Sequence, residues 1–93
     1  MTEVEWTPDA IDMFDALMES LASISPQSAE RISAEIVARI QQVVDFPFSG
    51  RVVAEYGERN FREIVVPPYR VMYRVRANGI TIEVVARGSW HLR

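Results

Sequence analysis

The dipeptide Asn78-Gly79 constrains the fold of this chain more than any other feature, because it separates two runs of alternating β-branched and aromatic residues. Asn-Gly between two such runs is the strongest short-range signal for a β-hairpin that is closed by a two-residue type I′ turn. The sequence therefore predicts antiparallel strands over residues 69–76 and 80–87.

The predicted register, in which Ala77 faces Ile80, gives this hairpin two chemically different faces. One face is built for burial and carries the facing pairs Val75/Ile82, Tyr73/Val84 and Val71/Ala86. The other face carries the pairs Arg76/Thr81, Arg74/Glu83, Met72/Val85 and Arg70/Arg87. Two facing arginines repel, so the pair Arg70/Arg87 costs stability unless an anion lies beside it. The pattern predicts an anion-binding site there, unless ordinary carboxylates such as Glu63 satisfy both arginines.

Two helices are predicted to precede the hairpin. Thr7 and Pro8 form a helix start, with a capping hydroxyl followed by proline at the first helical position, and this helix should run to about residue 23. Ser25-Pro26 repeats the signal, so the second helix folds back antiparallel on the first and ends near residue 45, before Pro47. Apolar stripes with a 3.6-residue period give both helices a core-facing side. They comprise Ala10, Phe14, Leu17 and Leu21 in the first helix and Ala29, Ile32, Ile36, Ile40 and Val43 in the second.

Further strands are expected over residues 2–6, 51–56 and 61–66. Pro67-Pro68 cannot supply the positive φ angles of a type I′ turn, so a longer loop is predicted after the 61–66 strand. A three-residue loop would place Arg62 on the face of Arg70, and another length would move it to the opposite face.

Helices first and antiparallel strands afterwards is the order of an α+β fold, in which a helical hairpin covers one face of a twisted, mainly antiparallel sheet. The sequence predicts a single domain over residues 1–93. The uncovered sheet face would carry Arg70, Met72, Arg74 and Arg87.

The composition of the chain excludes several classes of function. No apolar run approaches the roughly 20 residues that span a bilayer, and the N-terminus is acidic, so a cytoplasmic protein without membrane contact is expected. The chain has no cysteine and one histidine, so no metal or cofactor is expected. The net charge is −3, but residues 1–50 hold nine acidic side chains and two arginines, whereas residues 51–93 hold four acidic side chains and eight arginines. Nonspecific nucleic-acid affinity sums many phosphate contacts, so an acidic chain is poorly suited to it. Any anion that this protein recognises must be bound locally, by the arginines of residues 51–93.

Several short motifs follow one another in a fixed order. They are Trp6-Thr-Pro-x-Ala10, Ser25-Pro26, Phe46-Pro-x-x-Gly50-Arg51, Arg62-Glu-Ile64 and Tyr69-Arg70-Val-Met-Tyr73. This ordered set resembles the RelE/ParE superfamily of bacterial type II toxins and is most similar to the ParE branch. The resemblance implies a plasmid-stabilising toxin that arrests growth, and a cognate antitoxin that wraps and neutralises it in a hetero-oligomer.

The two branches of this superfamily act differently. RelE-like members cleave messenger RNA in the ribosome with two basic residues on one strand, an arginine after a tyrosine on the next, and an arginine and a tyrosine near the C-terminus. Arg62 and Arg70 match two of these positions, but Ile64 occupies the second basic position and no tyrosine follows Trp90. ParE-like members resemble poisons of DNA gyrase that act by binding. This branch fits better, although Ser89-Trp90 stands where two arginines are usual.

The resemblance therefore implies a gyrase inhibitor that is not an enzyme. A RelE-like, ribosome-dependent endoribonuclease, with Arg62 and Arg70 as its catalytic residues, is one alternative. A non-toxic module that binds an antitoxin is the other.

Six residues are candidates for contact with a target or antitoxin: Arg62, Arg70, Arg74, Arg87, Trp90 and His91. Arg74 and Glu83 are also expected to form an ordinary cross-strand ion pair. Trp90 and His91 either staple the C-terminal tail to the sheet or form an exposed contact patch. An incoming antitoxin segment would lay apolar side chains on the helical hairpin or add to a sheet edge, with its carboxylates on the arginines.

Overall fold

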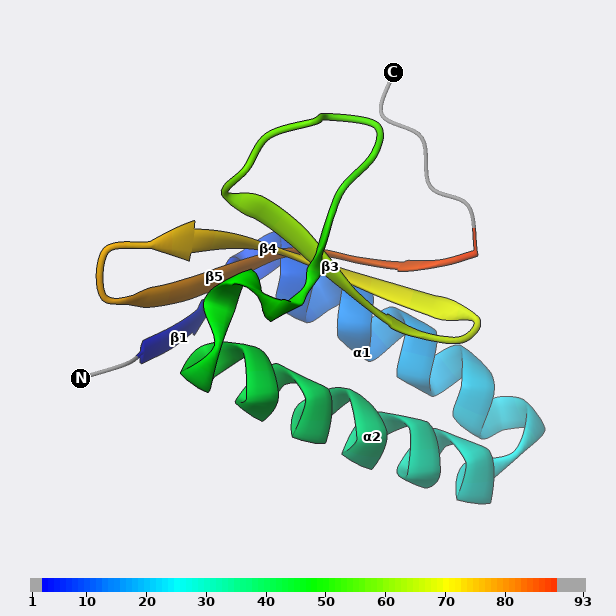
Figure 1. Cartoon of the computed structure of the whole chain (residues 1–93). Coiled ribbons are helices and arrows are strands. Elements are labelled where there is room, and N and C mark those ends of the chain that lie inside the picture. The colour runs from blue at the N-terminus through cyan, green and yellow to red at the C-terminus, as the bar shows by residue number, and fades with distance from the viewer. Residues whose placement is uncertain (1–2, 89–93) are drawn as a thin grey trace.

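The computed structural model of the chain describes residues 3–88 and shows a helical hairpin on one face of a five-stranded sheet (Figure 1). The elements are β1 (Glu3–Trp6), α1 (Pro8–Ile24), α2 (Pro26–Asp45), the 3₁₀ helix η1 (Pro47–Ser49), β2 (Arg51–Val52), β3 (Phe61–Val66), β4 (Tyr69–Arg76) and β5 (Gly79–Arg87). The strand order is β1-β5-β4-β3-β2, with β1 parallel to β5 and the other neighbours antiparallel. The predicted α+β fold is confirmed.

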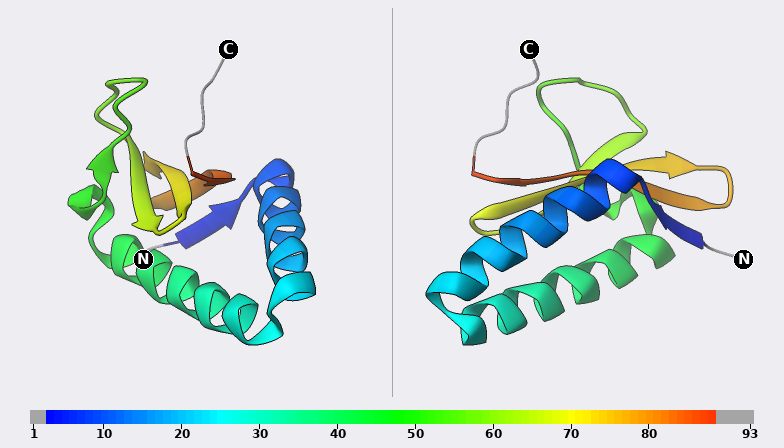
Figure 2. Two further views of the ribbon diagram at one scale, coloured as in Figure 1. Left: turned by 90° about the vertical axis from the view of Figure 1, so that its right-hand side faces the viewer. Right: turned by 180° about the vertical axis from the view of Figure 1, so that it is seen from behind.

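Both helices start where their caps predict. The Thr7 hydroxyl accepts a hydrogen bond from the Ala10 N–H at 3.0 Å, and the Ser25 hydroxyl accepts one from the Ser28 N–H at 3.2 Å. A proline occupies the first turn of each helix, where its missing N–H costs nothing. The two helices run antiparallel and diverge from their short connection, as Figure 2 shows from two further sides. Among the described residues, no helix combines the length and apolarity that a membrane crossing needs.

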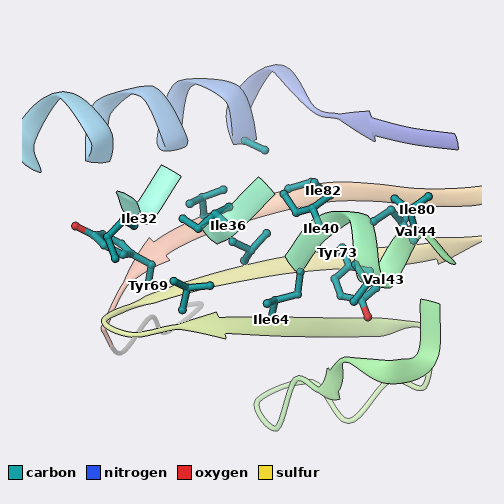
Figure 3. Packing of buried hydrophobic residues seen from close by; sticks show 14 residues of the cluster. Ile32, Ile36, Ile40, Val43, Val44, Ile64, Tyr69, Tyr73, Ile80 and Ile82 are labelled. Atoms are coloured by element: carbon teal, nitrogen blue, oxygen red, sulfur yellow. The ribbon is translucent and has the colours of Figure 1, made fainter. Parts of the chain in front are cut away.

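The main core lies between the helical hairpin and the sheet (Figure 3). The predicted α2 stripe is buried, and the facing side chains come from β3, β4 and β5. In α1, only Ala10 is fully buried, while Phe14, Leu17 and Leu21 pack against the core but stay partly exposed. The first helix therefore leaves apolar surface open beside the second.

The β4–β5 hairpin differs from the prediction in its turn. Arg76 faces Gly79, so the two loop residues are Ala77 and Asn78 rather than Asn78 and Gly79. Neither loop residue has a positive φ, which excludes the predicted type I′ turn.

Gly79 allows the backbones of β5 and β1 to approach each other closely. A Cβ at this position would overlap the backbone of Glu3 in β1. The Glu3 N–H donates to the Asn78 carbonyl at 2.9 Å, so β1 is hydrogen-bonded to the end of the turn. Contact with a strand more than 70 residues earlier in the chain, which local sequence does not reveal, thus explains the glycine.

A β-bulge in β5 changes the register further along the hairpin. Tyr73 faces Ile82 and Met72 faces Val84, which leaves Glu83 as an extra residue without a facing partner. An extra residue reverses the alternation of side chains beyond it.

The bulge separates the two arginines that the sequence places face to face. Arg70 faces Ala86 on the side of the sheet away from the helices, whereas Arg87 faces Tyr69 on the helix side. The predicted pair Arg70/Arg87 is therefore wrong, and so is the prediction that Ala86 faces the helices.

The prediction that the sheet face away from the helices is open is also wrong, because part of the chain covers this face. The connection over residues 53–60 arches above it (Figure 1). Beneath this connection lies a second buried cluster, in which Tyr56 stacks on Phe61 with ring centroids 5.0 Å apart. The buried members of this cluster are Val53, Phe61, Met72, Val84 and Ala86.

The β3–β4 connection is shorter than predicted. Val66 faces Tyr69, so Pro67 and Pro68, joined by a cis peptide bond, form a two-residue loop. This length sets the face of Arg62, which lies opposite Tyr73 on the helix side and away from the face of Arg70. The predicted edge strand over residues 51–56 is reduced to the two residues of β2.

Candidate functional site

A network of carboxylates and arginines lies on the sheet face away from the helices. At its centre is Glu63, whose side chain is only 4% exposed. Its carboxylate accepts hydrogen bonds from Arg70 Nε at 2.6 Å and from Arg51 Nη2 at 2.9 Å. Arg70 also donates from both terminal nitrogens to the two carboxylate oxygens of Glu55, each at 3.1 Å. The anion that Arg70 needs is therefore supplied by the chain itself.

Arg70 is held as a cation in this network. Hydrogen bonds to Glu55 and then Glu63 raise the pKa of its guanidinium above the ordinary value, although burial opposes them. Its side chain is 14% exposed, so a phosphate that bound here would have to displace Glu55. Arg70 thus lacks the open donors of a ready anion site.

Arg74 holds the same 53–60 connection from a neighbouring position. Its Nε lies 3.0 Å from Glu83 Oε2, its Nη1 lies 3.3 Å from Glu58 Oε1, and its guanidinium stacks 4.7 Å from the Phe61 ring centroid. The hydrogen bond to Glu83 is the main cause that raises the pKa of Arg74. The predicted ion pair with Glu83 is confirmed, but it runs diagonally, because the residue that faces Arg74 is Thr81.

Arg62 lies at the β2 edge and binds neutral groups. Its guanidinium donates to the carbonyl oxygens of Arg59 at 2.8 Å, Gly50 at 3.0 Å and Phe48 at 3.2 Å. The Phe48 ring is shared by two cations, with Arg59 at 4.5 Å and Arg62 at 5.1 Å from its centroid. A cation over an aromatic face is attracted by the ring quadrupole.

Tyr73 fixes the same segment from the core side. Its hydroxyl donates to the Pro47 carbonyl at 2.6 Å and accepts from the Gly50 N–H at 3.1 Å. A Cβ at residue 50 would overlap this hydroxyl, so glycine is required there. Burial raises the pKa of Tyr73, which keeps the phenol protonated as a donor.

Arg87 lies in a different place, in a groove between α1 and the end of β5. One part of this groove, of about 310 Å³, is lined by Leu17, Leu21, Ile24, Tyr69 and Arg87. The adjoining part adds Arg31, Ile32 and the two prolines of the β3–β4 loop. Within residues 3–88, no carboxylate pairs with Arg31 or Arg87. We call this region the Arg31/Arg87 groove.

A second hollow on the helical hairpin is apolar. It is lined by Trp6, Ile11, Phe14 and Val37, and the Trp6 and Phe14 rings meet edge to face at 5.5 Å. Ile11 and Val37 are exposed. We call it the apolar recess; it is part of the surface that α1 leaves open.

The six predicted contact residues therefore do not form one site. Arg70 and Arg74 are paired internally on one face, whereas Arg62 and Arg87 lie on the other. Trp90 and His91 lie outside the described residues.

Sequence reasoning missed Phe48, Arg59 and Arg31. Their surroundings depend on contacts between segments far apart in the chain, and no local motif signals them. The described residues contain no group of three histidine, cysteine or acidic side chains that could hold a metal ion.

The helical hairpin, the five-stranded sheet and its arginine-rich second half define a small domain of the RelE/ParE kind. A family model described as the ParE toxin of the type II toxin-antitoxin system parDE matches residues 4–89. The chain belongs to this family of toxins.

Two known proteins illustrate the relationship. Toxin RelE2 of Caulobacter vibrioides is 30% identical over 81 residues, which are 86% of each chain. A chain of the chromosomal ParDE TA system from P. aeruginosa superposes with a TM-score of 0.74 and 21% identity, covering 96% of this chain and 98% of that chain. The second likeness confirms the fold.

Proposed function

We propose that this ParE-family toxin arrests growth by binding and inhibiting DNA gyrase in the cytoplasm, and that a cognate antitoxin silences it. The observation that carries the proposal is the separation of Arg62 from Arg70 on opposite sheet faces. A phosphoryl-transfer site needs its cations to converge on one developing charge. Arg70 is occupied by two carboxylates and Arg62 by three carbonyl oxygens, an arrangement that favours binding over bond cleavage.

The helical hairpin supports the antitoxin part of the proposal. An amphipathic segment buries apolar side chains in hydrophobic grooves of this kind, and the apolar recess provides one on α1 and α2. Carboxylates of the partner would find two cations, Arg31 and Arg87, in the Arg31/Arg87 groove. The named ParDE system with the same fold also supports a hetero-oligomer with an antitoxin.

The deciding experiment combines expression with a purified assay. Without an antitoxin, expression should stop growth with DNA-damage signalling, and the purified chain should inhibit supercoiling by DNA gyrase. Co-expression of the product of the adjacent reading frame should restore growth. Unaffected gyrase together with cleaved ribosome-bound message would overturn the gyrase proposal.

The name of the relative, Toxin RelE2, keeps the endoribonuclease as a second candidate. That alternative predicts that Arg62→Ala and Arg70→Ala each abolish message cleavage without unfolding the protein. Because Arg70 contacts buried Glu63, the thermal unfolding of Arg70→Ala has to be compared with that of the wild type. A chain that is harmless without its partner would instead indicate a non-toxic, antitoxin-binding module.

A further inference from the structure

Exposed aromatic rings gather at the β2 edge of the sheet, where α2 ends. Phe46 is 70% exposed, Phe48 is 42% exposed and Val52 is 39% exposed. Arg59 and Arg62 lie over the Phe48 ring. We call this surface, formed by Phe46, Phe48, Val52, Arg59 and Arg62, the Phe48 platform. Neither the main core nor the second cluster uses these apolar groups.

The two arginines of the platform keep their charge available. Arg62 contacts carbonyl oxygens and the ring, which do not neutralise it. Arg59 has no ion pair within the described part of the chain. Arg70 and Arg74, by contrast, are each paired with two carboxylates. A carboxylate from outside could therefore bind the platform without displacing one of the chain's own.

The platform is also held in a fixed shape. Tyr73 binds the backbone at Pro47 and Gly50, and Arg62 binds the backbone at Phe48 and Gly50. The Ser49 hydroxyl donates to the Phe46 carbonyl at 2.7 Å. A surface that is ordered before binding loses less conformational entropy when a partner arrives.

We infer that the Phe48 platform is the surface through which the free toxin contacts its target, and that the target presents carboxylates beside apolar side chains. This inference rests on the proposed function and deepens it. Aromatic residues and arginine dominate the energetic centres of protein–protein interfaces, and the platform places both together. A nucleic acid is a poorer match, because its affinity sums many phosphate contacts and this chain of net charge −3 offers two unneutralised arginines here.

The platform is remote from the Arg31/Arg87 groove. Arg31 lies near the start of α2 and Phe46 directly follows its end, so roughly 22 Å of helix separates them at 1.5 Å per residue. Figure 1 shows the two ends of α2 on opposite sides of the molecule. The platform also shares no residue with the apolar recess, which is lined by Trp6, Ile11, Phe14 and Val37. Variants of the platform should therefore separate target binding from antitoxin binding.

The test uses the full chain with Phe48→Ala and Arg59→Ala, and Arg76→Ala as the matched control. Arg76 is a surface arginine whose side chain points to Thr81 and Glu83 of β5, on the side of β4 away from β3. Purified DNA gyrase is the probe, with binding and supercoiling inhibition as readouts. Growth arrest and capture by the adjacent gene product are measured in parallel.

We expect each platform variant to weaken gyrase binding and inhibition at least tenfold. It should keep the melting temperature within a few degrees and hold the antitoxin within twofold, and the control should match the wild type. If the wild type inhibits gyrase and both platform variants inhibit it equally well, the platform is not the target-binding surface. The proposed function would remain intact in that case.

If the wild type arrests growth without touching gyrase, the gyrase proposal fails, and relief of arrest by Phe48→Ala still supports the platform. If Phe48→Ala still arrests growth like this wild type, the platform is overturned as the target-binding surface. If the platform variants lose binding to a single-stranded RNA probe but still bind gyrase like the wild type, the inference that the platform binds an acidic protein surface is overturned. A harmless wild-type chain would overturn both proposals.

Discussion

Replacing Glu63 by glutamine tests whether the arginine network stabilises the second face of the sheet. Glutamine keeps the shape of the side chain but removes the buried negative charge that two arginines share. The carboxylate bonds to Arg70 at 2.6 Å and to Arg51 at 2.9 Å are both lost or weakened.

The expected magnitude follows from the exposure of the two partners. Arg51 is 69% exposed, so its ion pair contributes about 0.2 to 1 kcal/mol. Arg70 is largely buried, and a hydrogen bond to a charged group is worth about 1.5 to 3 kcal/mol. The bond of Arg70 to Glu55 remains and limits the loss. We therefore expect Glu63→Gln to lower the free energy of unfolding by about 2 to 3 kcal/mol, a large share of the roughly 5 to 15 kcal/mol of a small domain.

The assay is urea unfolding followed by circular dichroism, compared at constant denaturant slope. Glu58→Gln is the matched control, because Glu58 is 54% exposed and lies 3.3 Å from Arg74, and its loss should cost less than about 1 kcal/mol. If Glu63→Gln is within about 0.5 kcal/mol of the wild type, the network is not a source of stability and the reasoning is refuted.

Three further predictions concern the turn, the buried phenol and the groove. Gly79→Ala should cost about 1 to 3 kcal/mol and speed amide exchange at Glu3, because its Cβ overlaps that backbone; unchanged exchange would contradict the packing argument. Since burial raises the pKa of Tyr73, the folded chain holds the phenol proton after the unfolded chain has lost it. The stability that this group contributes is complete below about pH 10, the ordinary tyrosine value, and is lost as the pH rises through the folded-state pKa. Urea titrations at stepped alkaline pH should therefore show a shallower loss of stability in Tyr73→Phe than in the wild type, and equal slopes would speak against it. Arg87→Glu should weaken capture by the adjacent gene product at least tenfold in a binding titration, and equal affinity would remove the groove from the antitoxin site.

Local signals in the sequence placed the helices and the main strands. Thr7 and Ser25 with their following prolines mark both helix starts, because capping needs only neighbouring residues. The apolar stripe of α2 is recognisable for the same reason, since its 3.6-residue period is local.

The candidate site was less predictable, because a register depends on every residue between the turn and the site. The turn moved the pairing by two residues near the loop, and the bulge at Glu83 then moved it back by one, so that Arg70 faces Ala86 instead of Arg87. Pairing of Arg70 with a carboxylate of the chain such as Glu63 was the alternative to an external anion, and the structure shows this pairing. The separation of Arg70 from Arg87 was not predicted.

By itself, the sequence determined the class of the fold, its two helices and the ParE kinship, because caps, periods and ordered motifs are written in short stretches. Only the tertiary structure decided which arginines remain available to a partner. Charge is a property of a residue, but whether Arg70, Arg62 or Arg59 meets a carboxylate, a carbonyl or solvent depends on segments that the fold brings together. Those long-range contacts follow from the bulge, the two-residue proline loop and the arch over residues 53–60.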